Sequence, residues 1–394
     1  MTFRPEPTTS DKLPSGARHV LCARLDSLGD VLITGGAVRA VARSASRVTM
    51  LVAPAETSAA VLLPGVDDVL TFEAAWVRLD PPSLQPRTVR RLIRQLRRRR
   101  IDAALIFTSF HQSPLPLALL LRMAGVPWIG AISDDYPGSL LDLRHRVPAG
   151  LPEPERALSL ATAAGCPPDP DGARLAVRRP LPSAPDWLPQ RPYLVVHPGA
   201  AVPSRRPSPS TTRAIVHALN AEGWPVVVTG GSRETELTGV VTAAAVESVD
   251  AADQAVTAVG KAVDAGGRLS LAELATVIAG AEVVIAPNTG PAHLSAAVRT
   301  PVVSLHAPVV DFEQWGPYGV PRIRLGDQSA PCRGSRARQC PVPGHPCLDS
   351  IRPAEVVTAV RLLSRRTPQP RATDITVALG TDATSALTSE RHFS

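Results

Sequence analysis

Short apolar runs alternate with amphipathic stretches along most of this chain. Runs rich in Val, Ile and Leu between turn-forming residues are typical of buried strands, and apolar residues three or four positions apart predict helices. The pattern predicts strands at residues 19–25, 48–53, 101–107, 193–197, 225–229, 282–286 and 301–305. It predicts helices at residues 30–41, 88–100, 211–222 and 271–279. Because strands and helices alternate, we predict an α/β fold with parallel sheets and right-handed crossovers.

The alternation stops in the proline-rich stretch of residues 178–192 and then begins again. The chain has 394 residues, which is too long for one ordinary core and suits two domains of roughly 150–200 residues. We therefore predict two doubly wound, Rossmann-like domains. The predicted parts are a disordered lead-in (1–17), an N-terminal domain (18–180), a linker (181–192), a C-terminal domain (193–366) and a disordered tail (367–394).

Composition and charge narrow the choice of partners. The formal net charge of +7 favours anionic partners such as nucleotide diphosphates or acidic lipids. Nucleic acid is disfavoured, since 4% of the residues are aromatic and the chain has no recognisable nucleic-acid-binding motif. The sequence has no apolar run as long as a membrane span, and no charged start followed by an apolar stretch marks a secretory signal. We therefore expect a cytoplasmic protein.

The helix predicted at residues 88–100 has an arginine-rich face. Such a face is usually a solvated surface, but clustered arginines also bind phosphate groups, either on a phosphorylated acceptor or on an anionic membrane. The functional alternative is therefore peripheral contact with the inner face of the cell membrane. The arginines concerned are Arg90, Arg91, Arg94, Arg97 and Arg98.

Three of the five cysteines lie near one another in the sequence, at Cys332, Cys340 and Cys347, with His345 between the last two. Together these side chains could bind zinc. Their spacings of eight and seven lack the paired CxxC motifs of typical zinc sites. Structural cysteines or a disulfide are therefore favoured over a metal site.

Ligands of open parallel sheets bind at the carboxyl ends of strands, where helix N-termini present free N–H groups. Four loops at such positions carry polar residues. The first runs from Ser27 to Asp30, where Gly29 permits a tight turn and Asp30 opens the predicted helix. From spacing alone, Asp30 is more readily an N-cap worth about 0.5–2 kcal/mol than a general base. Asp26 is the competing carboxylate on this loop.

The next two loops lie in the C-terminal half. The HPGA loop at residues 197–200, which contains Gly199, precedes Ser204 and Arg205. A glycine turn followed by an arginine suits a diphosphate, although an arginine-rich surface loop is the alternative. The third loop contains Gly230 and then Glu234, which could accept from ribose hydroxyls or act as a first-turn helix acid.

The fourth loop runs from Asn288 to His293 with the sequence NTGPAH. Thr289, Gly290 and the following proline predict a turn into a helix whose N-terminus can bind a phosphate. His293 would lie in the first turn of that helix, facing the same ligand. A lone helical histidine is usually structural, but this turn after a buried strand is a more specific signal.

The sequence lacks the motifs of several enzyme classes. The first strand is not followed by GxGxxG, and GxxxxGK[ST], HExxH and GxSxG are absent. Nicotinamide-dependent dehydrogenases and P-loop phosphotransferases are therefore weakly supported, and metalloproteases and serine hydrolases have no support.

Taken in order, these motifs resemble glycosyltransferase family 9, the ADP-heptose:lipopolysaccharide heptosyltransferases. The likeness covers residues 18–365 and rests on residues 21–41, the HPGA loop, the TGG loop, the NTGPAHLSAA turn and the WGPYG segment at 315–319. It implies a GT-B architecture, in which two Rossmann-like domains face a central cleft. It also implies metal-independent, inverting sugar transfer without a cofactor. The donor would be a nucleotide sugar, ADP-heptose, and the acceptor a cell-envelope glycan or glycolipid.

The resemblance also implies roles for single residues. Asp30 matches the aspartate that deprotonates the acceptor hydroxyl, which reverses the preference for a cap, and Ser27 and Gly29 fall on the acceptor side. Thr289 and Gly290 match contacts to the donor diphosphate and sugar. The other residues expected on the donor side are Gly199, Ser204, Arg205, Gly230, Glu234, Asn288 and His293.

Two residues depart from the family pattern. Arg205 stands where the family usually has a phosphate-binding lysine, which replaces a point charge with a planar fork. Asn288 stands where the family typically has an aspartate that contacts donor-sugar hydroxyls. Because an amide carries no charge, a donor sugar other than heptose is an alternative. The alternatives are another GT-B nucleotide-sugar enzyme of the epimerase type and a non-catalytic nucleotide-sugar-binding protein.

Overall fold

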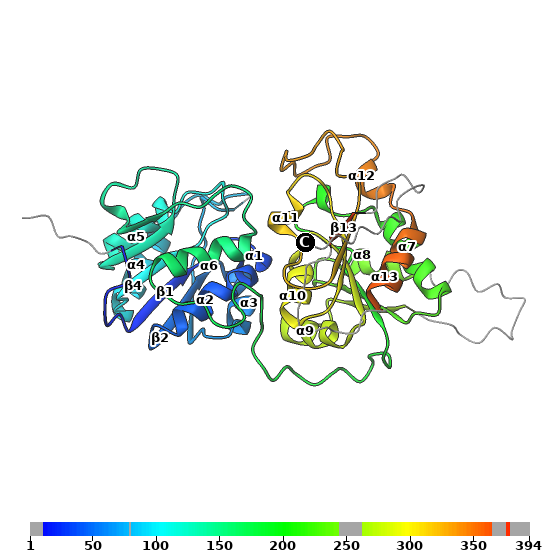
Figure 1. The fold of residues 1–394 in the computed structure, drawn as a ribbon, viewed down its shortest axis with the longest axis horizontal. Helices are drawn as coiled ribbons and strands as arrows, with labels where there is room; N and C mark the ends of the chain where they lie inside the picture. Colours follow the sequence, from blue (N-terminus) through cyan, green and yellow to red (C-terminus); the bar gives the residue numbers. More distant parts are fainter. Residues whose placement is uncertain (1–10, 79, 244–261, 365–375, 379–394) are drawn as a thin grey trace, which may run out of the picture.

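The computed structural model describes residues 11–78, 80–243, 262–364 and 376–378. The chain forms two lobes, each built on a parallel sheet with helices packed around it (Figure 1). The segment between the last helix of the first lobe and the first strand of the second crosses from one lobe to the other. The α/β fold with two doubly wound sheets is therefore confirmed.

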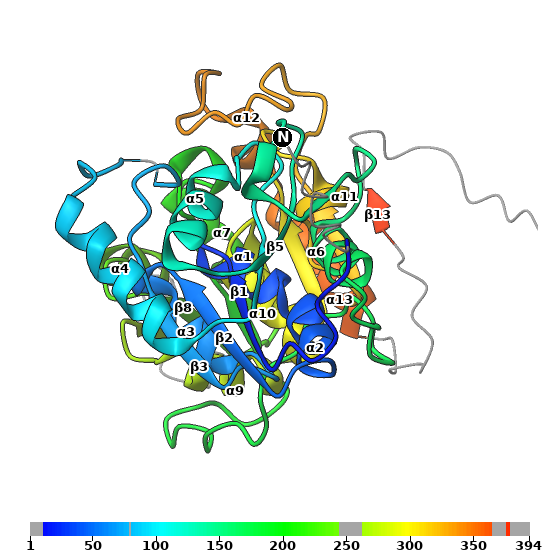
Figure 2. The ribbon, with the colours of Figure 1, turned by 90° about the vertical axis from the view of Figure 1, so that its left-hand side faces the viewer.

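The N-terminal sheet has six strands in the order β3-β2-β1-β4-β5-β6, all parallel to their neighbours. Figure 2 looks onto this lobe and shows β1, β2 and β3 side by side. The strands are β1 (His19–Ala23), β2 (Arg47–Val52), β3 (Asp68–Thr71), β4 (Ala103–Ile106), β5 (Trp128–Ile132) and β6 (Leu143–His145). The helices are α1 (Leu28–Ile33), α2 (Gly35–Ala42), η1 (Pro54–Glu56), α3 (Thr57–Leu62), α4 (Pro86–Arg99), α5 (Leu115–Ala124), η2 (Gly138–Leu140) and α6 (Glu153–Ala163).

The C-terminal sheet has seven strands in the order β13-β12-β11-β10-β7-β8-β9, again all parallel. Its strands are β7 (Leu194–Val196), β8 (Val226–Gly230), β9 (Val263–Gly266), β10 (Val283–Pro287), β11 (Val302–Leu305), β12 (Arg322–Leu325) and β13 (Thr376–Ala378). Its helices are η3 (Pro203–Arg205), α7 (Pro209–Ala221), α8 (Thr235–Ala243), α9 (Leu271–Gly280), α10 (Gly290–Val298), α11 (Phe312–Trp315), α12 (Pro346–Asp349) and α13 (Pro353–Ser364).

Both sheets have a point at which the strand order reverses, between β1 and β4 in the first and between β7 and β10 in the second. Loops that leave neighbouring strands at such a point diverge to opposite faces, which opens a crevice at the carboxyl ends of the strands. Asp26 and Ser109 follow β1 and β4, and His197 and Asn288 follow β7 and β10. Three of the four loops singled out in the sequence therefore lie at the reversal points of the two sheets, and the third follows the neighbouring strand β8.

The predicted strands all form, and their ends differ from the prediction by at most two residues. The helix predicted at residues 30–41 is wrong in two respects, since it begins at Leu28 and is interrupted at Thr34. The Thr34 hydroxyl donates to the carbonyl of Asp30 at 2.9 Å, and two glycines follow. Both features bend helices. The second glycine, Gly36, also lies against the Gly172 carbonyl, where a Cβ would come within 2.8 Å.

The two lobes touch through α1 and α10, which face each other in Figure 1. A buried apolar cluster continues across this contact and includes Leu32 of α1 and Leu294 of α10. Thr276 of α9 also donates to the carbonyl of Pro182 in the predicted linker, at 2.9 Å. The domain boundaries at residues 180 and 193 stay predictions.

The ends of the chain are described in part. Residues 1–10 of the predicted lead-in lie outside the described residues, while Leu13 N–H donates to the Ala164 carbonyl at 2.8 Å. Of the predicted tail, residues 367–375 and 379–394 lie outside the described residues, and Thr376–Ala378 form the edge strand β13. Across the described ranges, no helix is both long and apolar enough to cross a bilayer.

Candidate functional site

Asp30 lies in the first turn of α1, after the carboxyl end of β1. Ser27 is the N-cap of this helix, so the interpretation of Asp30 as its N-cap is wrong. Oδ2 of Asp30 accepts hydrogen bonds from the backbone N–H and the hydroxyl of Ser27, at 3.1 and 2.6 Å. Oδ1 accepts from Arg24 Nη2 at 3.0 Å. A carboxylate has about four acceptor positions, so a further acceptor position of Asp30 stays open to a ligand.

The guanidinium of Arg24 joins four polar groups beneath Asp30. Its side chain is 1% exposed, and its Nη2 also donates to Ser109 Oγ at 3.0 Å. Its Nε lies 3.2 Å from Asp26 Oδ1, and its Nη1 lies 4.0 Å from Glu153 Oε2. Burial disfavours the charge on this guanidinium, but the surrounding carboxylates outweigh burial and raise the pKa of Arg24. Arg24 therefore holds both aspartates of the loop in place.

The environments of the two aspartates drive their pKa values apart. Burial raises the pKa of Asp26, although Arg24 and hydrogen bonds from Ser109 and Gln112 oppose that shift. Burial acts on Asp30 in the same direction, but Arg24 and the Ser27 hydrogen bonds outweigh it and lower its pKa. Asp30 is also the more exposed of the two, at 13% against 8%. Asp30 is thus the ionised, accessible carboxylate, and Asp26 is the one buried behind it.

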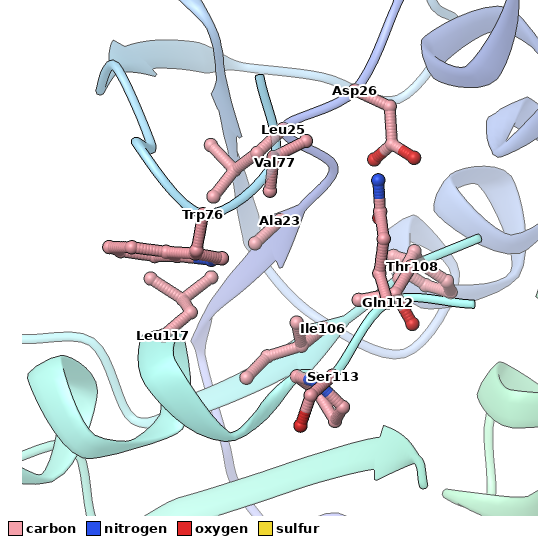
Figure 3. A pocket seen from close by; sticks show the side chains of 12 residues that line it. Ala23, Leu25, Asp26, Trp76, Val77, Ile106, Thr108, Gln112, Ser113 and Leu117 are labelled. Carbon is pink, nitrogen blue, oxygen red and sulfur yellow. The ribbon is translucent and has the colours of Figure 1, made fainter. Parts of the chain in front are cut away.

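A small pocket opens beside Asp26, and Figure 3 shows it from close by. Trp76, Ile106 and Leu117 form apolar walls, while the Asp26 carboxylate and the Gln112 amide face each other on the polar side. All of its lining residues belong to the N-terminal lobe, and Asp26 is the charged residue among them. The pocket therefore places an apolar surface next to the carboxylate pair.

The N-terminal and C-terminal motifs meet directly at Gly29. A Cβ on Gly29 would come within 2.8 Å of His293 Cδ2 and within 3.5 Å of the Gly290 Cα. A Cβ on Gly290 would come within 2.6 Å of Leu28 Cδ2. Both glycines therefore lie where the two helix N-termini approach so closely that an added Cβ would force a neighbouring side chain to shift. The close approach brings residues some 260 positions apart into one site, as the sequence predicts.

His293 is buried at this contact, and its Nδ1 has no hydrogen-bond partner among the described residues. Burial lowers its pKa to about 4, while the charge of Asp30 opposes that shift. The ring is therefore neutral at physiological pH. Thr289 directly precedes α10 and is its N-cap residue. The Thr289 hydroxyl makes no capping hydrogen bond. The hydroxyl and the Gly290 N–H are then available to an anion, while Pro291 has no N–H and the Ala292 N–H donates to the Thr289 carbonyl at 3.1 Å.

A second group of predicted donor-side residues gathers at the ends of β7 and β8. Glu234 Oε2 accepts from Gly231 N–H at 2.7 Å and lies 3.9 Å from His197 Nε2. A Cβ on Gly199 would come within 1.8 Å of Glu234 Oε1, and one on Gly230 within 3.1 Å of Glu234 Cβ. These two glycines leave the space that the Glu234 side chain fills. The structure thus brings Gly199, Gly230 and Glu234 together.

Arg205 and Ser204 follow β7 in the 3₁₀ turn η3. Arg205 Nε is buried and has no hydrogen-bond partner within the described ranges. Burial lowers the pKa of Arg205, and the nearby charge of Asp30 opposes that shift. The Ser204 hydroxyl donates to the Ala337 carbonyl, so this side chain fastens the turn to the segment that carries the cysteines. A donor contact from Ser204 stays a prediction.

Asn288 is the first residue after β10 and is 9% exposed. Its neighbours on either side are the end of β10 at Pro287 and the N-cap Thr289. The amide therefore lies at the reversal point of the C-terminal sheet, next to the free N-terminus of α10. This position suits a contact with a ligand bound at that helix terminus.

The cysteine segment holds free thiols. All five cysteines of the chain are unpaired, so the disulfide alternative is wrong. Burial, with the neighbouring Cys332, raises the pKa of Cys347 to about 12. His345 Nε2 lies 3.2 Å from the Ser204 carbonyl. In the parts of the chain that the structure describes, no group of three or more His, Cys, Asp or Glu side chains could hold a metal ion.

Sequence reasoning missed Arg24, Glu153 and Arg336. In the sequence, Arg24 is a single charged residue at the end of an apolar run. A charged residue at that position is equally typical of an ordinary strand end, so it does not indicate a functional site. Glu153 lies 129 positions after Arg24 along the chain and reaches it only through the packing of α6. Arg336 belongs to no sequence motif, and its contacts with the N-terminal lobe depend on how the two lobes pack against each other. These residues could be found only from tertiary structure.

Comparisons with known proteins agree with this architecture. The family described as glycosyltransferase family 9 (heptosyltransferase) matches residues 89–345. A lipopolysaccharide heptosyltransferase 3 from Escherichia coli is 30% identical over 173 residues. That alignment covers 43% of this chain and 46% of the relative, so the chain matches about half the length of this protein.

Solved structures with the same fold include three from this family. A glycosyltransferase family 9 protein from Veillonella parvula has a TM-score of 0.68 at 16% identity, covering 90% of this chain and 99% of that one. The ADP-heptose lipopolysaccharide heptosyltransferase II of Escherichia coli has a TM-score of 0.65 at 19% identity, covering 88% and 98%. An Escherichia coli heptosyltransferase with ADP has a TM-score of 0.62 at 17% identity, covering 88% and 99%. The GT-B fold expected from the sequence is thereby confirmed.

Proposed function

The chain belongs to glycosyltransferase family 9, and from that premise we propose that it transfers a sugar from a nucleotide-diphosphate donor to an envelope glycan or glycolipid. The observation that carries this proposal is the contact between the two lobes at Gly29 and His293. It brings an ionised carboxylate of the N-terminal lobe to the free helix terminus of the C-terminal lobe. A transfer reaction between two substrates needs these two elements, a base and an anion site, at one place.

The C-terminal lobe binds the donor in this proposal. The diphosphate lies at the N-terminus of α10, where the Gly290 N–H, the Thr289 hydroxyl and the helix dipole favour negative charge. Arg205 donates charge-assisted hydrogen bonds to the same phosphates, each contributing roughly 1.5–3 kcal/mol. Glu234 accepts from the ribose hydroxyls, and Gly199 and Gly230 leave the space that its side chain needs to lie at this end of the sheet.

The N-terminal lobe binds the acceptor and supplies the base. Asp30 removes the proton of the acceptor hydroxyl as the oxygen attacks the anomeric carbon of the donor. The new glycosidic bond forms on the face opposite the departing nucleoside diphosphate, so the anomeric configuration inverts. The proton stays on Asp30, and the electron pair of the broken bond leaves with the diphosphate. Arg205 and the α10 terminus stabilise the charge that develops there, a role that a divalent cation has in other phosphate sites.

The donor is proposed to be ADP-heptose and the acceptor a lipopolysaccharide core or a related glycolipid. This choice is supported by relatives described as lipopolysaccharide heptosyltransferases and by a related structure containing ADP. Asn288 is the residue that bears on the sugar, since it replaces the family's aspartate beside the diphosphate site. An uncharged amide binds sugar hydroxyls as donor and acceptor, so a donor sugar other than heptose is compatible with this site.

We place the protein in the cytoplasm, at the inner face of the membrane, through α4. Leu92, Ile93 and Leu96 pack α4 onto the lobe, which leaves its arginine face exposed to solvent. Each arginine near an anionic surface contributes about 1 kcal/mol. Replacing Arg90, Arg91 and Arg94 by glutamine should then abolish cosedimentation with vesicles containing phosphatidylglycerol at low salt. Unchanged sedimentation of that variant would show that the face is merely solvated.

The proposed activity is tested with a panel of nucleotide sugars and a phosphorylated core-oligosaccharide acceptor. Release of ADP that requires both ADP-heptose and the acceptor is the expected result, together with inversion of the anomeric configuration in the product. Release of UDP or GDP from another donor would support the transferase activity but identify a different donor nucleotide. Conversion of a nucleotide sugar without an acceptor would instead indicate the epimerase type. Binding without any turnover would indicate a nucleotide-sugar-binding protein.

A further inference from the structure

Arg336 lies on the segment between β12 and α12 and has an unusual backbone conformation. Its φ of 56° is left-handed, a conformation that residues other than glycine rarely adopt. The backbone is held there by a hydrogen bond from Arg336 N–H to the Val309 carbonyl at 2.9 Å. Such outliers persist where the surrounding structure enforces them, and they are frequent at ligand sites.

The Arg336 side chain reaches the opposite lobe. Its Nη2 lies 3.2 Å from His111 Nε2, and its guanidinium lies 4.8 Å from the ring centroid of Phe110. Because a guanidinium only donates, Nε2 of His111 must be the acceptor and the imidazole must be neutral. Burial and the charge of Arg336 lower the pKa of His111 to about 4, which agrees with a neutral ring. Phe110 and His111 therefore hold the guanidinium at the boundary between the lobes.

One nitrogen of the same guanidinium makes no hydrogen bond to the described residues. Arg336 Nη1 is buried, and no hydrogen-bond acceptor for it exists among the described residues. Arg205 Nε is in the same state. The segments that carry the two guanidinium groups are hydrogen-bonded to each other, because the Ser204 hydroxyl donates to the Ala337 carbonyl. The charge of Arg336 lowers the pKa of Arg205, and Asp30 is a nearby anion for both. Two partly buried cations that repel each other and share one carboxylate are stabilised by an additional anion.

We propose that Arg336 binds the donor diphosphate together with Arg205, so that the cysteine-bearing segment supplies a second guanidinium to the phosphate site. The inference rests on the proposed function, since it assumes a nucleoside diphosphate in this cleft. A planar guanidinium can bind two phosphate oxygens at once, and two such groups match the charge of a diphosphate better than one. Because Phe110 and His111 position Arg336, the N-terminal lobe also takes part in donor binding.

The test compares the affinities of ADP and AMP by isothermal titration calorimetry, with the full-length protein. Arg336→Asn removes the guanidinium, and asparagine tolerates the left-handed backbone. We expect this variant to bind ADP about 10- to 100-fold more weakly, the loss of one charge-assisted contact, and AMP less than threefold more weakly. Arg336→Lys keeps the charge but not the fork and should show an intermediate loss. Arg333→Asn, an exposed arginine of the same segment, is the matched control and should bind ADP like the wild type.

Three outcomes separate the possibilities. ADP affinity within twofold of the wild type in both Arg336 variants, at an unchanged melting temperature, would overturn the proposal. An equal loss for ADP and AMP would also overturn it, because it would indicate a displaced segment instead of a lost phosphate contact. Failure of the wild-type protein to bind ADP, UDP or GDP would contradict the proposed function itself. That last result is independent of any Arg336 variant, so the two failures are distinguishable.

Discussion

Arg24 Nη2 lies 3.0 Å from Asp30 Oδ1, and the Arg24 side chain is buried beneath the carboxylate. This ion pair lowers the pKa of Asp30 and keeps its carboxylate ionised. Burial alone would raise the pKa of Asp30, and Arg24 with Ser27 reverses that effect. Asp26 has the same cation but keeps a raised pKa, because burial dominates there. The loop therefore presents one carboxylate that is ionised at neutral pH and reaches the cleft.

Replacing Asp30 should remove the base and leave the donor site intact. We expect Asp30→Asn to lower kcat by about 10²- to 10⁴-fold, the usual contribution of a general base. The affinity for ADP should stay within threefold, because the amide can still accept from Ser27 and the phosphate site lies on the other lobe. Stopped-time assays of ADP release and calorimetric titration measure the two quantities. Asp26→Asn is the control, and a larger loss of kcat there would transfer the role of base to Asp26.

The pH dependence of kcat/KM should report the ion pair between Arg24 and Asp30. Since the pKa of Asp30 is lowered, the carboxylate is ionised at neutral pH, and activity is lost only as the pH falls through that lowered value. Without the cation, burial would dominate and raise the pKa. We therefore expect Arg24→Gln to shift the acid limb of the profile to higher pH, and Arg24→Lys to shift it less.

Stability provides the control for that experiment. Removing one partner of a buried ion pair costs about 3–5 kcal/mol, so Arg24→Gln should also lower the melting temperature. Asp30 contributes stability above its ordinary pKa, and this contribution is lost as the pH falls through the folded-state value. If Arg24→Gln is folded and its acid limb coincides with that of the wild type, Arg24 does not set the pKa of the base.

Gly29→Ala should disturb the contact between the lobes. The added Cβ would come within 2.8 Å of His293 Cδ2, so α1 and α10 would have to move apart. We expect kcat to fall at least tenfold, because a displacement of about 1 Å at reacting groups has large effects. Gly239→Ala in α8 is the matched control, since its Cβ would meet nothing closer than 3.9 Å. Equal activities of the two variants would show that the lobe contact is not needed for turnover.

The sequence predicts the strands of both sheets because their apolar runs are short, uninterrupted and bounded by turns. It also places Asp30 and His293 after the ends of strands in the two sheets, and the contact between α1 and α10 brings their loops together. The break at Thr34 was not predictable from periodicity, since the apolar pattern of α1 continues into α2. The Arg24 network was not predictable either, because Ser109 and Glu153 reach it from distant segments. Patterns along the chain specify elements, whereas ion pairs between elements depend on packing.

Variants of Asn288 test whether this side chain contacts the sugar or the diphosphate of the donor. The amide is nearly buried beside the N-cap of α10, and the resemblance to the family implies a contact with the donor sugar at this position. We expect Asn288→Ala to lower kcat/KM for the nucleotide sugar about 3- to 10-fold, the loss of one neutral hydrogen bond of about 0.5–1.5 kcal/mol. The affinity for ADP, which lacks the sugar, should change less than twofold. Asn288→Asp should alter the ratio of kcat/KM between ADP-heptose and an ADP-hexose, because a carboxylate only accepts and an amide also donates. A parallel loss of ADP affinity in the alanine variant would place Asn288 against the diphosphate instead of the sugar.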